Sequence, residues 1–148
     1  MGLDPEQGID KHFLTLAQGN KPILELETVD QQLDAILDTP EPDLLVRQSL
    51  AQLDDIERLM TELVGSWKRG DADALAKLVI EDELEAHPEF ADLHRRMFDD
   101  RNRAMTDRIL EMQARGGSYF VVVGAGHLVG EQGVVAMLER RGQSPRRL

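Results

Sequence analysis

Residues 118–130 read SYFVVVGAGHLVG, and this stretch decides the predicted fold. Its first half is a run of aromatic and β-branched side chains, which is typical of a strand buried on both faces. The run stops at a Gly-Ala-Gly turn beginning at residue 124, where glycine allows a sharp bend or the close approach of another group. We therefore expect a strand over 118–123. His127 then lies beyond its carboxyl end, where open α/β sheets bind their ligands.

A second strand is predicted over residues 22–27, which read PILELE. Apolar and acidic side chains alternate there, which is the period of a strand. Proline is tolerated at the first position of such a strand. The alternation places Glu27 at the carboxyl end, on the face opposite to Leu24 and Leu26. The two strands together indicate an α/β fold that is predominantly helical.

Most of the chain between these strands is predicted to form helices. Apolar side chains recur every three or four residues from Val46 to Trp67, and Gly70 is expected to end this helix. Residues 81–89 are acidic and contain a proline, so a loop or frayed turn is predicted there. The pattern is helical again over 90–115.

We expect one domain over residues 1–148, in which a helical segment of about residues 42–115 lies between the core strands. Two strands do not make a stable sheet by themselves. Either most of the fold is a helical bundle, or the missing strands lie outside this chain. A homo-oligomer is one way to cover the exposed sheet edge.

Composition excludes several classes of protein. The chain is 41% apolar and 30% charged, which is typical of a globular domain, and it contains no cysteine for disulfide or thiolate chemistry. Its formal net charge of −11 argues against a nucleic-acid partner, because phosphates demand a basic surface. No apolar run reaches the length of about 18 residues that a membrane span needs. The N-terminus also lacks the features of a signal peptide.

His127 is the first candidate for a functional residue. Imidazole titrates near neutral pH and suits Mn, Co or Zn, so His127 could be a metal ligand or a general acid and base. The alternative is a structural histidine hydrogen-bonded at a strand end. A dinucleotide-binding site is rejected, because Val129 stands where the G-x-G-x-x-G motif needs its third glycine and the remaining tail is short and basic.

Three further candidates lie elsewhere in the chain. Glu27 would point toward the same rim as His127, although a solvent-facing acid or a helix cap is the alternative. Arg101 and Asn102 border the apolar stripe of their helix and need polar partners there. They could clamp an oxyanion or a carboxylate, or form a structural ion pair with an internal acid. The remaining histidines, including His94, have no metal-ligand spacing and are expected to be exposed.

Five motifs occur in the order and spacing of a known family. They read GIDKHF from residue 8, KPI and LET within 21–28, WKRGD at 67–71, RNRAM at 101–105 and VGAGHL at 123–128. On these motifs the chain resembles the TraB/GumN family, which is related to the Tiki proteases, over nearly its whole length.

The resemblance implies a metal-dependent hydrolytic site built from two G-x-x-H motifs, a glutamate and an arginine. Gly124 and His127 match the second G-x-x-H, with Gly126 as a further motif glycine. Glu27 matches the glutamate of L-E-T, while Arg101 and Asn102 match the R-N pair. The first G-x-x-H is absent, so the chain resembles the C-terminal half of the family domain. The resemblance also implies a bacterial protein, with the cell envelope as a candidate compartment.

The implied activity is hydrolysis of a peptide bond or a small-molecule substrate with Mn²⁺, Co²⁺ or Zn²⁺. His127 would bind the metal, Glu27 would be a second ligand or the general base, and Arg101 would stabilise developing negative charge. We expect the chain alone to be inactive or very weak, since one histidine and one glutamate rarely hold a catalytic metal. The alternatives are a non-catalytic module that binds a peptide along the helices of residues 42–115, and a structural domain without activity.

Overall fold

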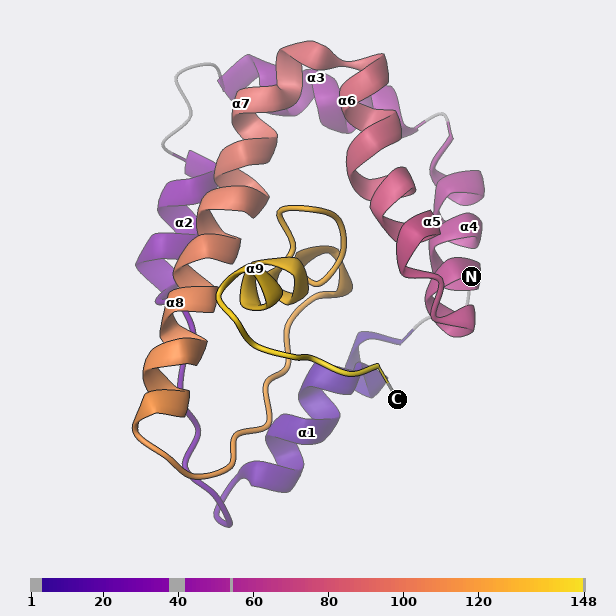
Figure 1. Cartoon of the computed structure of the whole chain (residues 1–148). Coiled ribbons are helices and arrows are strands. Elements are labelled where there is room, and N and C mark those ends of the chain that lie inside the picture. The colour runs from indigo at the N-terminus through magenta and orange to yellow at the C-terminus, as the bar shows by residue number, and fades with distance from the viewer. Residues whose placement is uncertain (1–3, 38–41, 54, 148) are drawn as a thin grey trace.

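The computed structural model describes residues 4–37, 42–53 and 55–147, and this part of the chain is helical (Figure 1). The first half contains η1 (Pro5–Gln7), α1 (Ile9–Ala17), α2 (Val29–Leu37), α3 (Pro42–Leu53) and α4 (Ile56–Arg69). The second half contains α5 (Ala72–Ala76), η2 (Lys77–Glu81), α6 (Asp82–Ala86), η3 (Pro88–Phe90), α7 (Ala91–His94), η4 (Arg95–Asp99), α8 (Asp100–Ala114), η5 (Ala125–His127) and α9 (Val134–Arg140).

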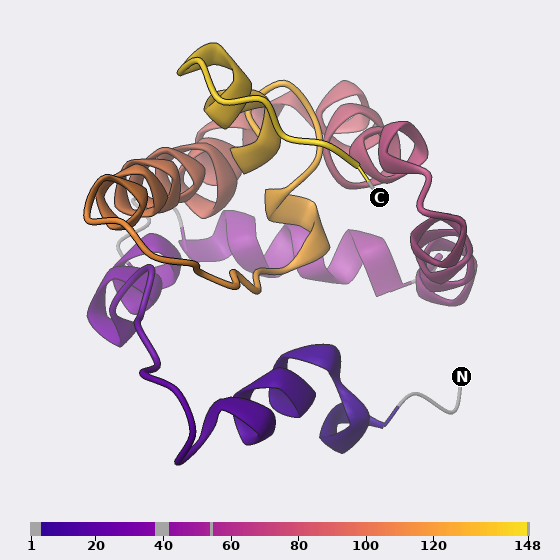
Figure 2. The same ribbon diagram turned by 60° about the horizontal axis from the view of Figure 1, so that its bottom comes forward.

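The second half of the chain forms two helical arms around a central helix. One arm runs without a break from α5 through the π-helical turn η2 to α6, and the other from α7 through the π-helical turn η4 to α8. Helix α9 lies between the arms, while α3 runs along one side of them (Figures 1 and 2). Helix α1 lies at one side of the molecule, after which a long connection leads to α2 (Figure 2). No described helix is long and apolar enough to cross a membrane.

The prediction of an α/β fold with two core strands is wrong, because the described residues contain no strand. Residues 22–25 and 118–123 are irregular segments. None of their backbone N–H groups donates to a backbone carbonyl of the part that the structure describes. Phe120 is 72% exposed rather than buried on both faces. The strand propensity of these segments is real, but a strand needs a hydrogen-bonded neighbour, and the described chain supplies none.

The helix end predicted at Gly70 is confirmed. Gly70 ends α4 in the left-handed conformation, with φ of +65°. Asp71 then caps α5, because its carboxylate accepts a hydrogen bond of 3.1 Å from the backbone N–H of Ala74. The single helix expected from residue 46 to 67 is instead divided into α3 and α4. The loop predicted at 81–89 is wrong as well, since α6 and η3 occupy most of it.

The core is small and joins the arms to the C-terminal region. Leu75, Ala76 and Val129 form a buried cluster with Leu63 and Ala72 packed against it. On the other arm, α8 packs against α9, and each helix contributes two buried apolar side chains. These are Met105 and Met112 of α8, and Val134 and Met137 of α9. The C-terminal region therefore holds the arms together, and the loop from 124 to 133 is fixed between them.

Candidate functional site

An ion pair connects the segment after residue 22 to the first turn of α8. The Arg101 guanidinium donates from Nε to Glu27 Oε2 at 2.9 Å and from Nη2 to Glu27 Oε1 at 2.6 Å. Arg101 Nη1 donates to the Met97 carbonyl at 3.0 Å, within the π-helical turn η4. Both side chains are mostly buried, with exposed fractions of 15% and 17%. Glu27 is thus neither a solvent-facing acid nor a helix cap, because both of its oxygens accept from Arg101.

Asn102 ties α8 to the loop that carries His127. It is 2% exposed, and its Nδ2 donates to the Gln132 carbonyl at 2.8 Å. Its Oδ1 lies 2.6 Å from His127 Nδ1. A backbone carbonyl can only accept, so the amide orientation is determined by Gln132, and Oδ1 must accept the hydrogen from Nδ1 of His127. His127 is therefore held as the Nδ1–H tautomer, and its Nε2 keeps a lone pair for a proton or another ligand.

The electrostatics of the site favour the neutral imidazole. Burial is the main cause that lowers the pKa of His127 below its usual value, and the charge of Arg101 lowers it further. Glu27 acts in the opposite direction. The pKa of Glu27 is itself lowered, chiefly by the hydrogen bonds from Arg101. Near neutral pH the site thus contains a charged Glu27–Arg101 pair beside an uncharged imidazole.

Arg101→Met is expected to raise the pKa of His127, because it removes a positive charge and leaves the Glu27 carboxylate uncompensated. Proton NMR of the imidazole from about pH 4 to about pH 9, a range that spans the usual histidine pKa, measures this shift. Arg103→Met is the matched control, since Arg103 lies on the same helix but is exposed and pairs with Asp100. An unchanged pKa in Arg101→Met would contradict the assigned cause.

The lowered pKa of His127 also fixes the sign of its effect on stability. The unfolded chain binds the proton at His127 more readily than the folded chain does. The contribution of His127 to the free energy of unfolding is therefore complete above the pKa that this residue has in the unfolded chain. It is lost as pH falls through the folded pKa. The free energy of unfolding is therefore expected to fall on acidification below about pH 6.5, the usual histidine value.

The two motif glycines have different surroundings. A Cβ at Gly126 would lie 3.2 Å from Cε1 of Phe98, so glycine there allows the aromatic ring to approach the backbone. A Cβ at Gly124 would meet nothing closer than His127 Cδ2 at 3.7 Å. Glycine was expected here to allow either a sharp bend or the close approach of another group. The surroundings of Gly126 correspond to the second, since the Phe98 ring lies close to its backbone.

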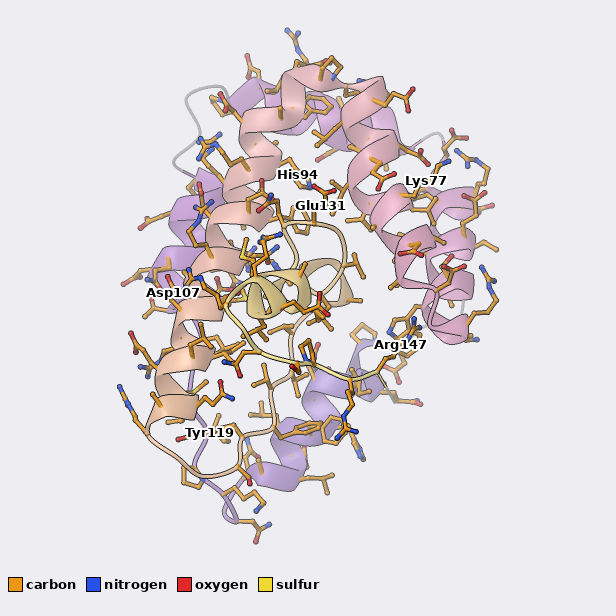
Figure 3. All side chains as sticks on the ribbon, in the orientation of Figure 1. Lys77, His94, Asp107, Tyr119, Glu131 and Arg147 are labelled. Carbon is orange, nitrogen blue, oxygen red and sulfur yellow. The ribbon has the colours of Figure 1, made fainter. Side chains whose placement is uncertain are left out.

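His94 was predicted to be exposed, which is wrong. It lies at the end of α7 and points toward the centre of the molecule (Figure 3). Its ring stacks on Phe98 with centroids 4.8 Å apart, and the Phe98 ring lies 5.4 Å from that of His127. Burial lowers its pKa, and its Nε2 is buried without a hydrogen-bond partner in the described part of the chain. The spacing of four residues between His94 and Phe98 was the signal available in the sequence.

His127 borders an apolar groove with a volume of about 430 Å³. The groove lies between α4, the arm that begins with α5, and the Gly-Ala-Gly turn. Its lining consists of Leu63, Val64, Trp67, Leu75, Val79, Phe98, Gly124, Ala125, Gly126 and His127. His127 is the only one of these side chains that can ionise. The groove therefore places a neutral imidazole at the wall of an apolar hollow, as many ligand sites do.

The residues that the structure describes do not by themselves fit a catalytic metal ion. Such a site usually needs three protein ligands with free donor atoms. Glu27 is already engaged by Arg101 at both oxygens and by Gln32 Nε2, which donates to Oε1 at 3.3 Å, whereas His127 Nε2 keeps a free lone pair. Among the described residues, no group of three or more His, Cys, Asp or Glu side chains is arranged to hold a metal. The predicted ligand pair of His127 and Glu27 is therefore incomplete.

Comparison with known proteins places the chain in a family. The model of the TraB/PrgY/gumN family matches residues 1–147. The uncharacterised protein YbaP of Escherichia coli (strain K12) is 30% identical over 141 residues, and YbaP of Shigella flexneri matches to the same extent. The alignment covers 93% of this chain but 50% of each relative, so the chain spans about half the length of the curated relatives it matches. No solved structure matches the chain. The chain belongs to the TraB/PrgY/gumN family.

Proposed function

We propose that this chain carries the histidine-bearing part of a hydrolytic site, with peptide bonds as the substrate class. The observation that supports this most directly is the hydrogen bond of 2.6 Å between His127 Nδ1 and Asn102 Oδ1. It fixes the tautomer in which Nε2 can accept a proton from a water molecule, which is the first requirement of a general base. The apolar groove beside the ring would hold the substrate.

In this proposal the other predicted residues position the imidazole rather than react. Asn102 orients the ring. The Glu27–Arg101 pair holds the segment after residue 22 against α8, and the charge of Arg101 helps to keep His127 uncharged. Nε, Nη1 and Nη2 of Arg101 each donate one hydrogen bond to Glu27 or to the Met97 carbonyl, so a direct role in stabilising an oxyanion would use the second N–H of Nη1 or Nη2.

The divalent metal that the family resemblance implies would need donors in addition to His127. In this proposal those donors belong to polypeptide outside the described residues, and the chain alone cleaves peptides weakly or not at all. The relatives are about twice as long as the aligned region, which leaves room for such residues.

The reactivity of His127 can be tested in the chain alone with the activated ester 4-nitrophenyl acetate. The His127→Ala variant is expected to lose most of the protein-dependent rate. The rate of the wild type should reach its plateau at a lower pH than that of free imidazole, because the neutral form reacts and the pKa of His127 is lowered. His87→Ala is the control, since His87 lies near Glu89 in the acidic stretch away from this groove. Equal rates in the wild type and His127→Ala would overturn the proposal.

A second candidate function is peptide binding without catalysis, which the apolar lining of the groove favours. Trp67 is the one tryptophan of the chain, lines the groove and is 53% exposed, so its fluorescence reports on occupancy. A peptide rich in aliphatic residues is expected to shift the emission to shorter wavelength in a saturable way, in the wild type and in His127→Ala alike.

The control for this titration compares two leucines. Leu63→Gln alters the groove and should weaken binding, whereas Leu50→Gln alters an exposed side chain of α3 outside the groove and should not. If the peptide leaves the emission unchanged, or if both variants behave alike, the binding function is wrong. If binding is seen but His127→Ala has no effect on ester hydrolysis, peptide binding replaces hydrolysis as the function.

A further inference from the structure

His94 is a titratable side chain that the proposed reaction does not use. It lies at the end of α7, close to the point where the two arms join, and points toward the centre of the molecule (Figure 3). Its Nε2 is buried and has no hydrogen-bond partner among the described residues. Most buried polar atoms in proteins are hydrogen-bonded, so this nitrogen calls for a physical reason.

The surroundings of Nε2 suit the neutral imidazole. An unpaired lone pair inside a protein costs less than an unpaired N–H group, so Nε2 is the unprotonated nitrogen of the neutral ring. Protonation would add a hydrogen to Nε2, where no described acceptor lies within hydrogen-bond reach. Burial accordingly lowers the pKa of His94, although the charges of Asp99 and Glu83 oppose this effect. The arrangement of the structure is therefore that of the uncharged residue.

Phe98 connects His94 to the apolar groove. The rings of His94 and Phe98 are stacked, with an angle of 20° between their planes and centroids 4.8 Å apart. The same Phe98 ring lines the groove, lies 5.4 Å from the ring of His127 and would lie 3.2 Å from a Cβ at Gly126. Phe98 also belongs to η4, and π-helical turns are frequent at functional sites. A change at His94 therefore reaches the groove wall through one aromatic ring.

Two carboxylates act on His94, one from each arm. Glu83 belongs to α6 and Asp99 to η4, and both favour the charged imidazolium. The loop from 124 to 133 contributes His127, whose ring contacts Phe98, and Glu131, whose side chain is exposed. The stack itself attracts an imidazolium, but a charged N–H that is buried without an acceptor costs more. A proton on Nε2 would therefore draw the ring toward Glu83 or Asp99, neither of which is bonded to Nε2 in the stacked position.

We propose that His94 is a pH-dependent positioning residue of the groove. In its neutral form it supports Phe98 against Gly126 and keeps the groove wall beside His127 in place. In its charged form the imidazolium leaves the stack to donate from Nε2 to a carboxylate, and Phe98 loses this support. The groove then binds apolar peptides less well in acid, whatever the charge of His127. This inference rests on the groove as the ligand site of the proposed function, but not on hydrolysis by His127.

NMR can follow the contact between Phe98 and Gly126 in this chain without any ligand. We expect a nuclear Overhauser effect between the Phe98 ring and the Gly126 Hα protons at about pH 8 and its loss at about pH 5, on either side of the usual histidine pKa. The midpoint of this loss should coincide with the titration of the His94 ring. The contact of 3.6 Å between Thr106 and Met137 in the core should persist at both pH values, which separates a local change from unfolding.

Two substitutions of His94 test whether its charge causes the loss. His94→Phe can stack on Phe98 but cannot be protonated, so the contact with Gly126 should not change with pH. His94→Gln is also uncharged at every pH and introduces no larger ring, so it provides the same test if His94→Phe does not fold. In both variants the dependence on pH should be absent.

Two further substitutions separate His94 from the other histidines. His127→Ala removes the second imidazole that contacts Phe98, and the loss of the contact in acid should remain. His87→Ala is the matched control, since the His87 ring lies 5.1 Å from that of Phe90 near the same junction of the arms but is partly exposed and pairs with Glu89. It should behave as the wild type does.

The proposal is wrong if the contact between Phe98 and Gly126 persists in acid in the wild type, or if its loss survives in both His94 variants. It is also wrong if the contact between Thr106 and Met137 is lost at the same pH. A loss that His127→Ala abolishes would assign the effect to the charge of His127. Because no substrate is present, failure of ester hydrolysis or of the peptide titration would not alter this result, and a contact independent of pH would overturn this inference alone.

Discussion

Gly133→Ala is expected to destabilise the protein by about 3 kcal/mol, the upper range for overpacking a well-packed position. A Cβ at Gly133 would lie 2.5 Å from the Val129 carbonyl oxygen and 2.9 Å from the carbonyl carbon and oxygen of Leu128. These are backbone atoms, so no side-chain rotation can relieve the contact. Either α9 or the loop from 124 to 133 must move, and urea denaturation would show the loss as a lower midpoint.

Gly124→Ala is the matched control for this substitution. Gly124 lies in the same loop, its φ of −56° suits any residue, and its Cβ would make only an ordinary contact of 3.7 Å with His127. Its effect should stay within about 1 kcal/mol, as for most substitutions without a steric cause. Equal effects of the two substitutions would show that the loop is not fixed as described.

Asn102→Ala is expected to cost about 2–3 kcal/mol and to release His127. Asn102 is buried, so the variant loses two hydrogen bonds and leaves the Gln132 carbonyl and His127 Nδ1 without this partner. The imidazole would then populate both tautomers. Urea denaturation measures the first effect and ¹H–¹⁵N NMR of the ring the second.

Asn102→Asp separates the two roles of this side chain. A carboxylate can still accept from Nδ1–H, but it cannot donate to the Gln132 carbonyl. The Nδ1–H tautomer should therefore persist while the pKa of His127 rises, because a negative charge now lies beside the ring. If Asn102→Ala keeps a single tautomer with unchanged stability, the role assigned to Asn102 is wrong.

The helices could largely be predicted from the sequence, whereas the strands could not. Gly70 and Asp71 end one helix and begin the next by local chemistry, a left-handed glycine and a carboxylate cap, and the structure shows both. The strand predictions at 22–27 and 118–123 were wrong because strand pairing does not depend on local sequence alone. A β-branched run expresses a preference, but only a hydrogen-bonded neighbour turns it into a strand, and the described chain contains none.

The loop prediction for the acidic stretch at 81–89 was wrong for a different reason. Its carboxylates and Pro88 suggested a loop, yet acidic side chains are favourable in the first turn of a helix, and proline is tolerated at the first position of the next. These residues are therefore signals for the start of a helix, and the interpretation of them as a loop was wrong.

The structure brings the candidate residues together in two pairs. Glu27 and Arg101, 74 residues apart, meet in the structure, and Asn102 meets His127. Pattern alone could not show that Arg101 donates to both oxygens of Glu27, which makes the two side chains a mostly buried ion pair. Nor could it show that Asn102 fixes the tautomer of His127, because that inference depends on the Gln132 carbonyl 30 residues away.

The most direct measurement is the tautomer of His127 in the wild-type protein, read from long-range ¹H–¹⁵N correlations of the imidazole at about pH 8, well above the usual histidine pKa. We predict a single neutral form with the proton on Nδ1 and an unprotonated Nε2, assigned by its loss in His127→Ala. A proton on Nε2, or rapid exchange between the two tautomers as in free imidazole, would contradict the site described above.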